Sequence, residues 1–402
     1  MVAAVGANVP VVALAVNLLV GISMGANVVV ATAVGARDAK AAQAASATAV
    51  IAALVGGVLI ALVGELAAGA LLSVLQVPDD VFPLALAYLR VYLAGIPAVM
   101  LYNLQAAVFR GIGQARAPLV PLVAANVLNM VLDVLFVGVL GAQAAGLAAA
   151  TALSYLVSAL ILLYRITHAE STVRLSRKTA HVDAQALAAI LKIGLPAGVQ
   201  GAVFAVSNII VQAAIDSLGQ QAIAASTAAY SIEILVYFLL NSFGQACATF
   251  VGQNRGARNA SRCRKTLAAC LGEGLATVAV AIALVLVAGK FMLTLIGGPD
   301  VVELGYVRLM FVFSAYAFST MYEVLSGYLR GFGITLVPSV LVVAGVCGVR
   351  LAWIAAVFPA HGTFQAIMCA YPVSLCATAV LLITATALYR PASRMAQRER
   401  KG

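Results

Sequence analysis

Residues 41–64 read AAQAASATAVIAALVGGVLIALVG, a stretch without a single Asp, Glu, Lys or Arg. About 20 consecutive apolar residues suffice for an α-helix to cross the hydrocarbon core of a bilayer. The stretch lies between Lys40 and Glu65, so charged side chains stand where such a helix would leave the membrane. Residues 41–64 therefore predict a transmembrane helix.

The composition of the whole chain extends this prediction. Of its 402 residues, 63% are hydrophobic and 9% are charged, whereas a soluble globular chain has about 45–50% and about 25%. This excludes an ordinary soluble enzyme, a nucleic-acid-binding protein and a disordered scaffold. The chain also has no GxxxxGK[ST] loop, and Gly111-Ile112-Gly113 follows an apolar run instead of a strand. We therefore expect neither an enzyme nor a bound cofactor.

Eleven apolar runs are long enough to span a bilayer. They predict an all-α polytopic membrane protein with two helical lobes and 11 transmembrane helices, five in the N-terminal lobe and six in the C-terminal lobe. The expected parts are an N-terminal lobe (1–166), a cytoplasmic linker (167–186), a C-terminal lobe (187–388) and a basic cytoplasmic tail (389–402). The runs are 7–33, 41–64, 82–109, 118–139, 143–165, 187–215, 222–252, 263–289, 302–329, 336–358 and 363–388.

The basic residues predict the orientation of these helices. Alternate connections and the C-terminal tail hold 20 of the 24 Lys and Arg residues, and Arg90, Lys290, Arg308 and Arg350 are the others. Because loops rich in Lys and Arg stay in the cytoplasm, we expect a cytoplasmic C-terminus and an external N-terminus in a multi-pass protein of the bacterial inner membrane. Anionic lipid accounts for the basic loops, so no nucleic-acid partner is expected.

The chain repeats itself at an offset near 220. Gly35-Ala36-Arg37-Asp38 matches Gly256-Ala257-Arg258-Asn259, and Arg110-Gly111-Ile112-Gly113 matches Arg330-Gly331-Phe332-Gly333. Two such halves are typical of transporters with a site between the repeats. The counterpart of the run 187–215 would precede residue 1, so we expect a shortened form of a twelve-helix protein.

Several passages resemble the MATE (multidrug and toxic compound extrusion) family. They are Ile232-Glu233 through Phe250-Val251-Gly252-Gln253-Asn254-Arg255-Gly256-Ala257, Gly327 through Gly333, and the stretch from Pro118 to Thr151. The resemblance implies a two-lobed antiporter of twelve helices that exports organic, often cationic, drugs in exchange for Na⁺ or H⁺. In many members the first helix carries an acidic residue used in cation coupling. The internal repeat indicates that this chain lacks the counterpart of that helix.

Asp133 is the sharpest candidate for ion coupling because an ionisable residue inside a membrane is costly. Asn129 and Asn126 precede it by four and seven residues and share its helical face, and Thr151 returns on the next helix to a similar depth. Carboxylate, amide and hydroxyl oxygens suit Na⁺, and the carboxyl group could instead bind a proton. Asp133, Asn129 and Thr151 also match a cation site in the N-lobe of some MATE proteins. The structural alternative is a buried hydrogen bond between helices.

Glu233 is the main candidate for substrate binding. Tyr230, Tyr237 and Asn241 share its helical face, and a carboxylate beside aromatic rings could bind an organic cation. The alternative is a structural pairing within the C-lobe. Gln200 and Asn208 could likewise line a wet cavity or join helices, and Asn103, the repeat partner of Glu323, is a further candidate for substrate binding. For Glu323 and Arg330, two turns apart, an ion pair, an inner gate and ligand contact stay open.

These observations predict a secondary antiporter that exports organic, mainly cationic, compounds and works as a monomer in the lipid bilayer. Two alternatives remain. One is a flippase for a lipid-linked precursor, which would need basic residues around its cavity, and few lie in the middle of the apolar runs. The other is an inactive remnant, since a missing helix would open the N-lobe to lipid.

Overall fold

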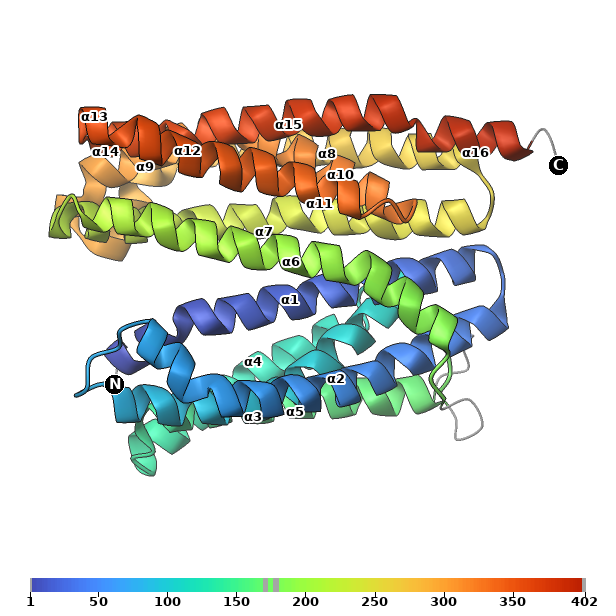
Figure 1. The fold of residues 1–402 in the computed structure, drawn as a ribbon, viewed down its shortest axis with the longest axis horizontal. Coiled ribbons are helices and arrows are strands. Elements are labelled where there is room, and N and C mark those ends of the chain that lie inside the picture. The colour runs from blue at the N-terminus through green and yellow to red at the C-terminus, as the bar shows by residue number, and fades with distance from the viewer. Residues whose placement is uncertain (1, 169–172, 176–180, 400–402) are drawn as a thin grey trace. The chain divides into compact units, whose positions relative to one another are not determined.

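A computed structural model describes residues 2–168, 173–175 and 181–399. Parts of the expected linker and tail, residues 169–172, 176–180 and 400–402, lie outside the described residues. Every described element is a helix (Figure 1). The chain divides into two compact units, Met1–Gly198 and Val199–Gly402.

The first unit holds α1 (Val2–Gly35), α2 (Ala39–Val74), α3 (Phe82–Gly111), α4 (Leu119–Asp133), the π-helical segment η1 (Val134–Val139), α5 (Gln143–His168) and the start of α6 (Ala184–Asp216). Helix α3 packs between α2 and α5 and also contacts α1. Small side chains such as Ala45, Ala49 and Ala148 fill this core, as expected where helix backbones approach closely in a membrane.

The second unit is built from the rest of α6 and from the elements that follow it. Helix α10 lies against α7, α8 and α15 and so occupies the centre of this unit. The elements are α7 (Gln220–Gly256), α8 (Ala260–Gly297), η2 (Pro299–Val301), α9 (Val302–Ser314), α10 (Tyr316–Gly331), α11 (Leu336–Val342), η3 (Val343–Gly348), α12 (Val349–Ala356), α13 (Phe358–His361), α14 (Phe364–Met368), α15 (Ala370–Tyr389) and α16 (Pro391–Glu399).

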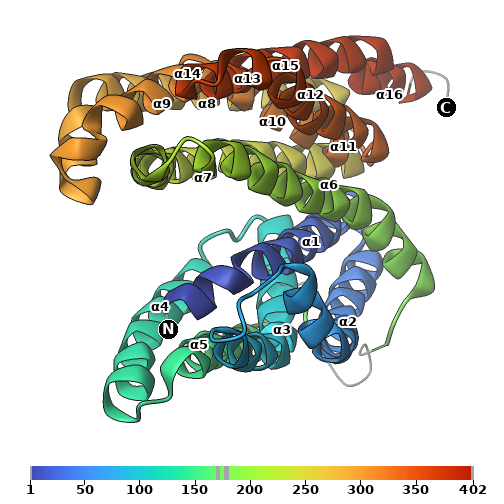
Figure 2. The ribbon, with the colours of Figure 1, turned by 60° about the vertical axis from the view of Figure 1, so that its left-hand side comes forward.

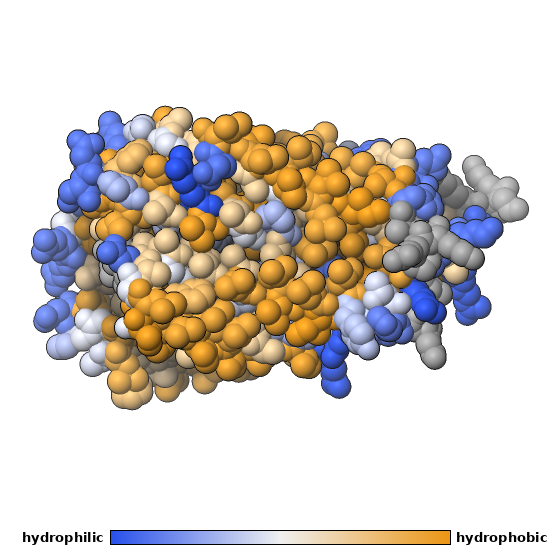
Figure 3. All heavy atoms as spheres, turned by 90° about the horizontal axis from the view of Figure 1, so that it is seen from below, coloured by the Kyte–Doolittle hydropathy of each residue, from blue (hydrophilic) through white to orange (hydrophobic). Residues whose placement is uncertain are grey.

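The prediction of 11 membrane-spanning segments is confirmed by length and composition. In the described part of the chain, 10 helical segments can cross a bilayer, and the pair Pro299–Ser314 and Tyr316–Gly331, bent by 46°, counts as one further span. Hydrophobic side chains cover the face seen in Figure 3, and hydrophilic residues gather at its two ends. On α2 the exposed side chains include Leu59, Leu62 and Leu66, which recur at helical spacing.

The internal repeat is visible in the local structure of both units. Arg37 and Arg258 each adopt a positive φ, 58° and 51°. The next residues, Asp38 and Asn259, each cap the following helix through a side-chain oxygen. A Cβ atom on Gly111 would meet the Val30 side chain and the Asn27 backbone, and on Gly331 it would meet Val251 and Ala248 at the equivalent positions.

The structure adds two features to the expected organisation. The boundary between the compact units falls within α6, because Gly194 and Gly198 of its first half lie directly against Gly21 and Ile22 of α1. The expected basic tail forms α16 up to Glu399, at the C-terminal end of α15 (Figure 2). Ala392 of α16 is buried with Tyr328 and three cysteines of α7 and α8, so apolar packing holds this helix in place.

Candidate functional site

The first cluster of predicted site residues lies on α4 and α5. Asn126, Asn129 and Thr151 line one small cavity, together with Ser154 and Tyr155 of α5. Asp133 stands one helical turn beyond Asn129, at the last residue of α4, and is not part of the cavity lining. The structure therefore brings the amide and hydroxyl groups together, with the carboxylate next to them.

Asp133 and Asn129 both present polar atoms without a protein partner. One carboxylate oxygen of Asp133, Oδ1, and the amide nitrogen Nδ2 of Asn129 are buried, and neither has a hydrogen-bond partner among the described residues. The Thr151 hydroxyl donates to the Leu147 carbonyl at 3.0 Å, which leaves its oxygen lone pairs available. Buried polar atoms are normally satisfied. The free Asp133 oxygen can accept a proton, a cation or a hydrogen bond from water, and the free Asn129 amide nitrogen can donate a hydrogen bond to water or to another acceptor.

The backbone changes from α-helical to π-helical directly after Asp133. Residues Val134–Val139 form η1, and the chain then turns at Gly141, where φ is +66°. Single π-helical turns inside α-helices are rare and often occur at functional sites. Tyr88 of α3 lies within electrostatic range of Asp133, which makes it a neighbour that sequence reasoning missed.

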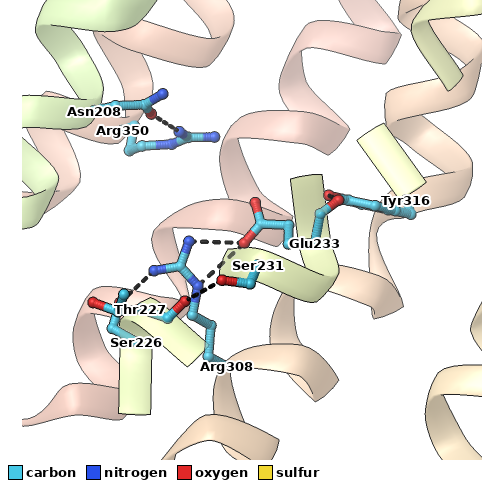
Figure 4. Close-up of polar contacts among 8 residues, drawn as sticks. All are labelled: Asn208, Ser226, Thr227, Ser231, Glu233, Arg308, Tyr316 and Arg350. Carbon is cyan, nitrogen blue, oxygen red and sulfur yellow. Dashed lines mark hydrogen bonds and ion pairs between the residues drawn. The ribbon is translucent and has the colours of Figure 1, made fainter. Parts of the chain in front are cut away.

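Glu233 of α7 forms an ion pair with Arg308 of α9 (Figure 4). Its Oε2 atom accepts from Nε of Arg308 at 3.1 Å and from Nη2 at 2.7 Å, and the two side chains are 12% and 4% exposed. Arg308 also donates to the Ser226 hydroxyl and lies over the Tyr230 ring at 5.5 Å. The carboxylate proposed for an organic cation is thus already neutralised, as in the structural alternative.

Arg350 of α12 lies near this pair and is 2% exposed. Its Nη1 donates to Asn208 Oδ1 at 3.4 Å, and its guanidinium carbon lies 4.3 Å from the centre of the Tyr371 ring. Arg308 approaches the same ring at 5.5 Å. Arg308 and Arg350 were not among the residues predicted to form a site, although an arginine inside a membrane span is a functional candidate by default.

The other predicted residues of the second unit have protein partners. Tyr237 donates to Glu323 at 3.4 Å, and Arg330 donates to Gln200 at 2.7 Å. Of the roles left open for Glu323 and Arg330, a direct ion pair does not form among the described residues, whose hydrogen bonds go to Tyr237 and Gln200 instead. Asn241 accepts from Gln245 at 2.7 Å.

Asn103 belongs to the first unit. Its side chain donates to the Val99 carbonyl of its own helix at 2.8 Å.

Up to 11 candidate membrane spans in the described residues, with charged side chains buried among them, define the chain as a polytopic membrane protein with functional sites inside its helical units. The MatE family model matches residues 1–135 and 196–354. The chain therefore belongs to the MatE family of multidrug efflux transporters.

Comparisons with individual proteins agree with this assignment. The chain is 24% identical over 358 residues to the probable multidrug resistance protein YoeA of Bacillus subtilis (strain 168), covering 87% of this chain and 77% of that protein. It is 29% identical over 273 residues to the probable multidrug resistance protein YpnP of the same organism, covering 67% of this chain and 61% of that protein. A solved structure described as the outward-facing conformation of a multidrug resistance MATE family transporter is similar, with a TM-score of 0.90, 20% identity and coverage of 98% and 89%. This structural similarity, at 20% identity, supports the fold alone.

Proposed function

We propose that the chain is a secondary active antiporter that exports organic compounds in exchange for H⁺ or Na⁺, and that Asp133 binds the coupling ion. The observation that carries the proposal is the buried, unpartnered carboxylate oxygen of Asp133 beside the cavity of Asn129 and Thr151. The relatives named as multidrug resistance proteins support export as the direction of transport.

The physical basis is that one binding event changes the charge of a half-buried carboxyl group, one oxygen of which is fully buried. A proton or Na⁺ on Asp133 would neutralise a carboxylate that stands largely alone among apolar helices. The free energy of binding the proton or Na⁺ depends on how much the Asp133 carboxylate is desolvated in each conformation of the transporter. An ion can therefore shift the conformational equilibrium only if it binds the two conformations with different affinities.

The test is Asp133→Asn in proteoliposomes, with an imposed pH or Na⁺ gradient and two probes, ethidium and 2-naphthoate. We expect gradient-driven export of the probes to fall at least about tenfold, because Asn cannot take up the ion whose gradient drives export. Exchange of the probes without a gradient should persist. Glu65→Gln is the matched control, since Glu65 is an exposed carboxylate of the same unit, paired with Arg90.

Thermal unfolding in detergent shows whether Asp133→Asn is folded. A folded Asp133→Asn variant that still exports against a gradient like the parent chain would refute the role of Asp133. Loss of both gradient-driven export and exchange would assign Asp133 to the transport path instead of to coupling.

A further inference from the structure

Arg350 is a buried cation without a carboxylate partner in the described part of the second unit. Its side chain is 2% exposed, and its Nε atom has no hydrogen-bond partner among these residues. Its hydrogen bond to Asn208 is long, at 3.4 Å. Figure 4 shows this contact apart from the Arg308–Glu233 pair.

The charges around Tyr371 do not balance. Two guanidinium groups face this ring, Arg350 at 4.3 Å and Arg308 at 5.5 Å. Among the described residues, the carboxylate that forms an ion pair with one of these two arginines is Glu233, which gives one oxygen to both Nε and Nη2 of Arg308. Because a guanidinium does not lose its proton in proteins, one positive charge is left uncompensated in an apolar environment, which is costly.

The surroundings of Arg350 favour an organic anion as the missing partner. A guanidinium matches the two oxygens of a carboxylate better than any other side chain does. Tyr371 and Phe204, at 4.3 and 5.9 Å from the Arg350 guanidinium, place aromatic rings beside the group that would hold the acidic end of such a molecule. Arg350 and Tyr371 are buried, whereas Phe204 and Asn208 are half-buried and Tyr230 is 44% exposed, so a ligand would have to reach Arg350 past these three side chains.

We propose that Arg350 binds the acidic group of a transported organic anion, and that Tyr371 and Phe204 contact its aromatic or aliphatic body. The inference rests on the proposed export function and names a substrate class for it: soluble organic carboxylates, or zwitterions that carry one. Glu233 holds Arg308, whose guanidinium lies 5.5 Å from the centre of the Tyr371 ring. Asn208 orients the Arg350 guanidinium.

The experiment compares 2-naphthoate with the neutral 2-naphthamide, which has the same ring and nearly the same shape. Binding to the full chain in detergent is measured by calorimetry and by the fluorescence of Trp353, the single tryptophan, which lies one turn from Arg350. We expect naphthoate to bind roughly ten- to a hundredfold more tightly than naphthamide, as a charge-assisted pair implies. Arg350→Gln should abolish this preference, and Arg350→Lys should retain part of it.

Arg90→Gln is the control, because Tyr88-Leu89-Arg90 matches Tyr306-Val307-Arg308 in the internal repeat, but Arg90 is exposed. It should leave the preference for naphthoate unchanged. Thermal unfolding without ligand provides a second readout. Arg350→Met should keep or raise the melting temperature if the charge is uncompensated, whereas a structural arginine would lower it.

Equal binding of naphthoate and naphthamide, or a preference that survives in folded Arg350→Gln, would overturn the proposal. So would a site that binds phosphatidic acid but not naphthoate, since that result assigns Arg350 to a lipid phosphate. These measurements need no ion gradient. Failure of gradient-driven export with intact, Arg350-dependent naphthoate binding would count against the antiport function alone.

Discussion

At the scale of single residues, the two units carry different buried charged groups. The first has Asp133, with a buried oxygen that lacks a protein partner in the described structure, and Arg110, whose buried Nε likewise lacks one there. The second has three buried arginines, Arg308, Arg330 and Arg350, and two largely buried acidic residues, Glu233 and Glu323. A repeated scaffold thus bears different chemistry in its two halves, which suits an exporter that binds its ion and its substrate at separate sites.

The buried Glu233–Arg308 pair should be essential for folding, whereas the exposed Glu65–Arg90 pair should not be. Arg308→Met leaves a buried carboxylate unpaired, so we expect a loss of about 3–5 kcal/mol in the free energy of unfolding. The double variant Glu233→Gln with Arg308→Met should recover most of this loss. Arg90→Gln, which breaks the exposed pair with Glu65, should cost less than about 1 kcal/mol. Thermal unfolding of the four proteins in detergent measures these differences.

If the single variant Arg308→Met melts like the parent chain, the ion pair does not hold α7 to α9. A double variant no more stable than Arg308→Met would show that the arginine acts through its contacts with Ser226 and Tyr230.

Sequence reasoning could find the charged residues but not their partners. The intramembrane positions of Asp133, Glu233 and Glu323 follow from the apolar runs around them. The pairing of Glu233 with Arg308 joins residues 75 positions apart. It depends on how α7 packs against α9, which no local pattern records.

At the scale of elements, the apolar runs predicted the helices well because each run is one membrane span. The 46° break between α9 and α10 was not predicted, since the run 302–329 contains no proline. The break occurs at Ala315, where φ is −108° and ψ is 2° and the amide bonds to Val312 at 3.2 Å in a tighter turn. Tertiary contacts set such a bend, among them the bond from Tyr316 to the Glu233 carbonyl at 3.3 Å.

Gly327 of α10 should tolerate no side chain. A Cβ atom there would overlap the backbone of Gly244 on α7, and a Cβ on Gly244 would lie 2.8 Å from the Glu323 carbonyl oxygen. Because both neighbours are backbone, the two helices must move apart, at a cost of about 1–3 kcal/mol or more. We expect Gly327→Ala to reduce the yield of folded protein and its melting temperature in detergent.

Gly272→Ala on α8 is the matched control, since a Cβ atom there meets nothing within 4 Å. It should be neutral or slightly stabilising, because Ala favours the helix more than Gly does. Equal behaviour of the two variants would mean that the α7–α10 contact can relax.

At the scale of the whole molecule, the distribution of positive charge determines how the chain is inserted. Of the four Lys and Arg residues outside the 20 assigned to cytoplasmic connections, Arg308 and Arg350 are buried within the second unit. Only Arg90 and Lys290 then remain to oppose the bias, and Arg90 is paired with Glu65. Arg330, one of the 20, is buried as well, so 19 basic residues stand against two. The charge asymmetry that the sequence indicates persists, and the cytoplasmic C-terminus stays a prediction.

Alkaline phosphatase fusions in a bacterial host test this orientation directly, because the enzyme needs disulfides that form only outside the cytoplasm. We expect activity from fusions after Asp80 and Gly298, in the α2–α3 and α8–η2 connections. Fusions after Gly113 and Arg258, which follow α3 and α7 at basic connections, should be inactive. The reverse pattern would place the 20 basic residues outside. The proposed coupling site would then face the opposite gradient, so the same chain would have to take up the compounds that it is proposed to export.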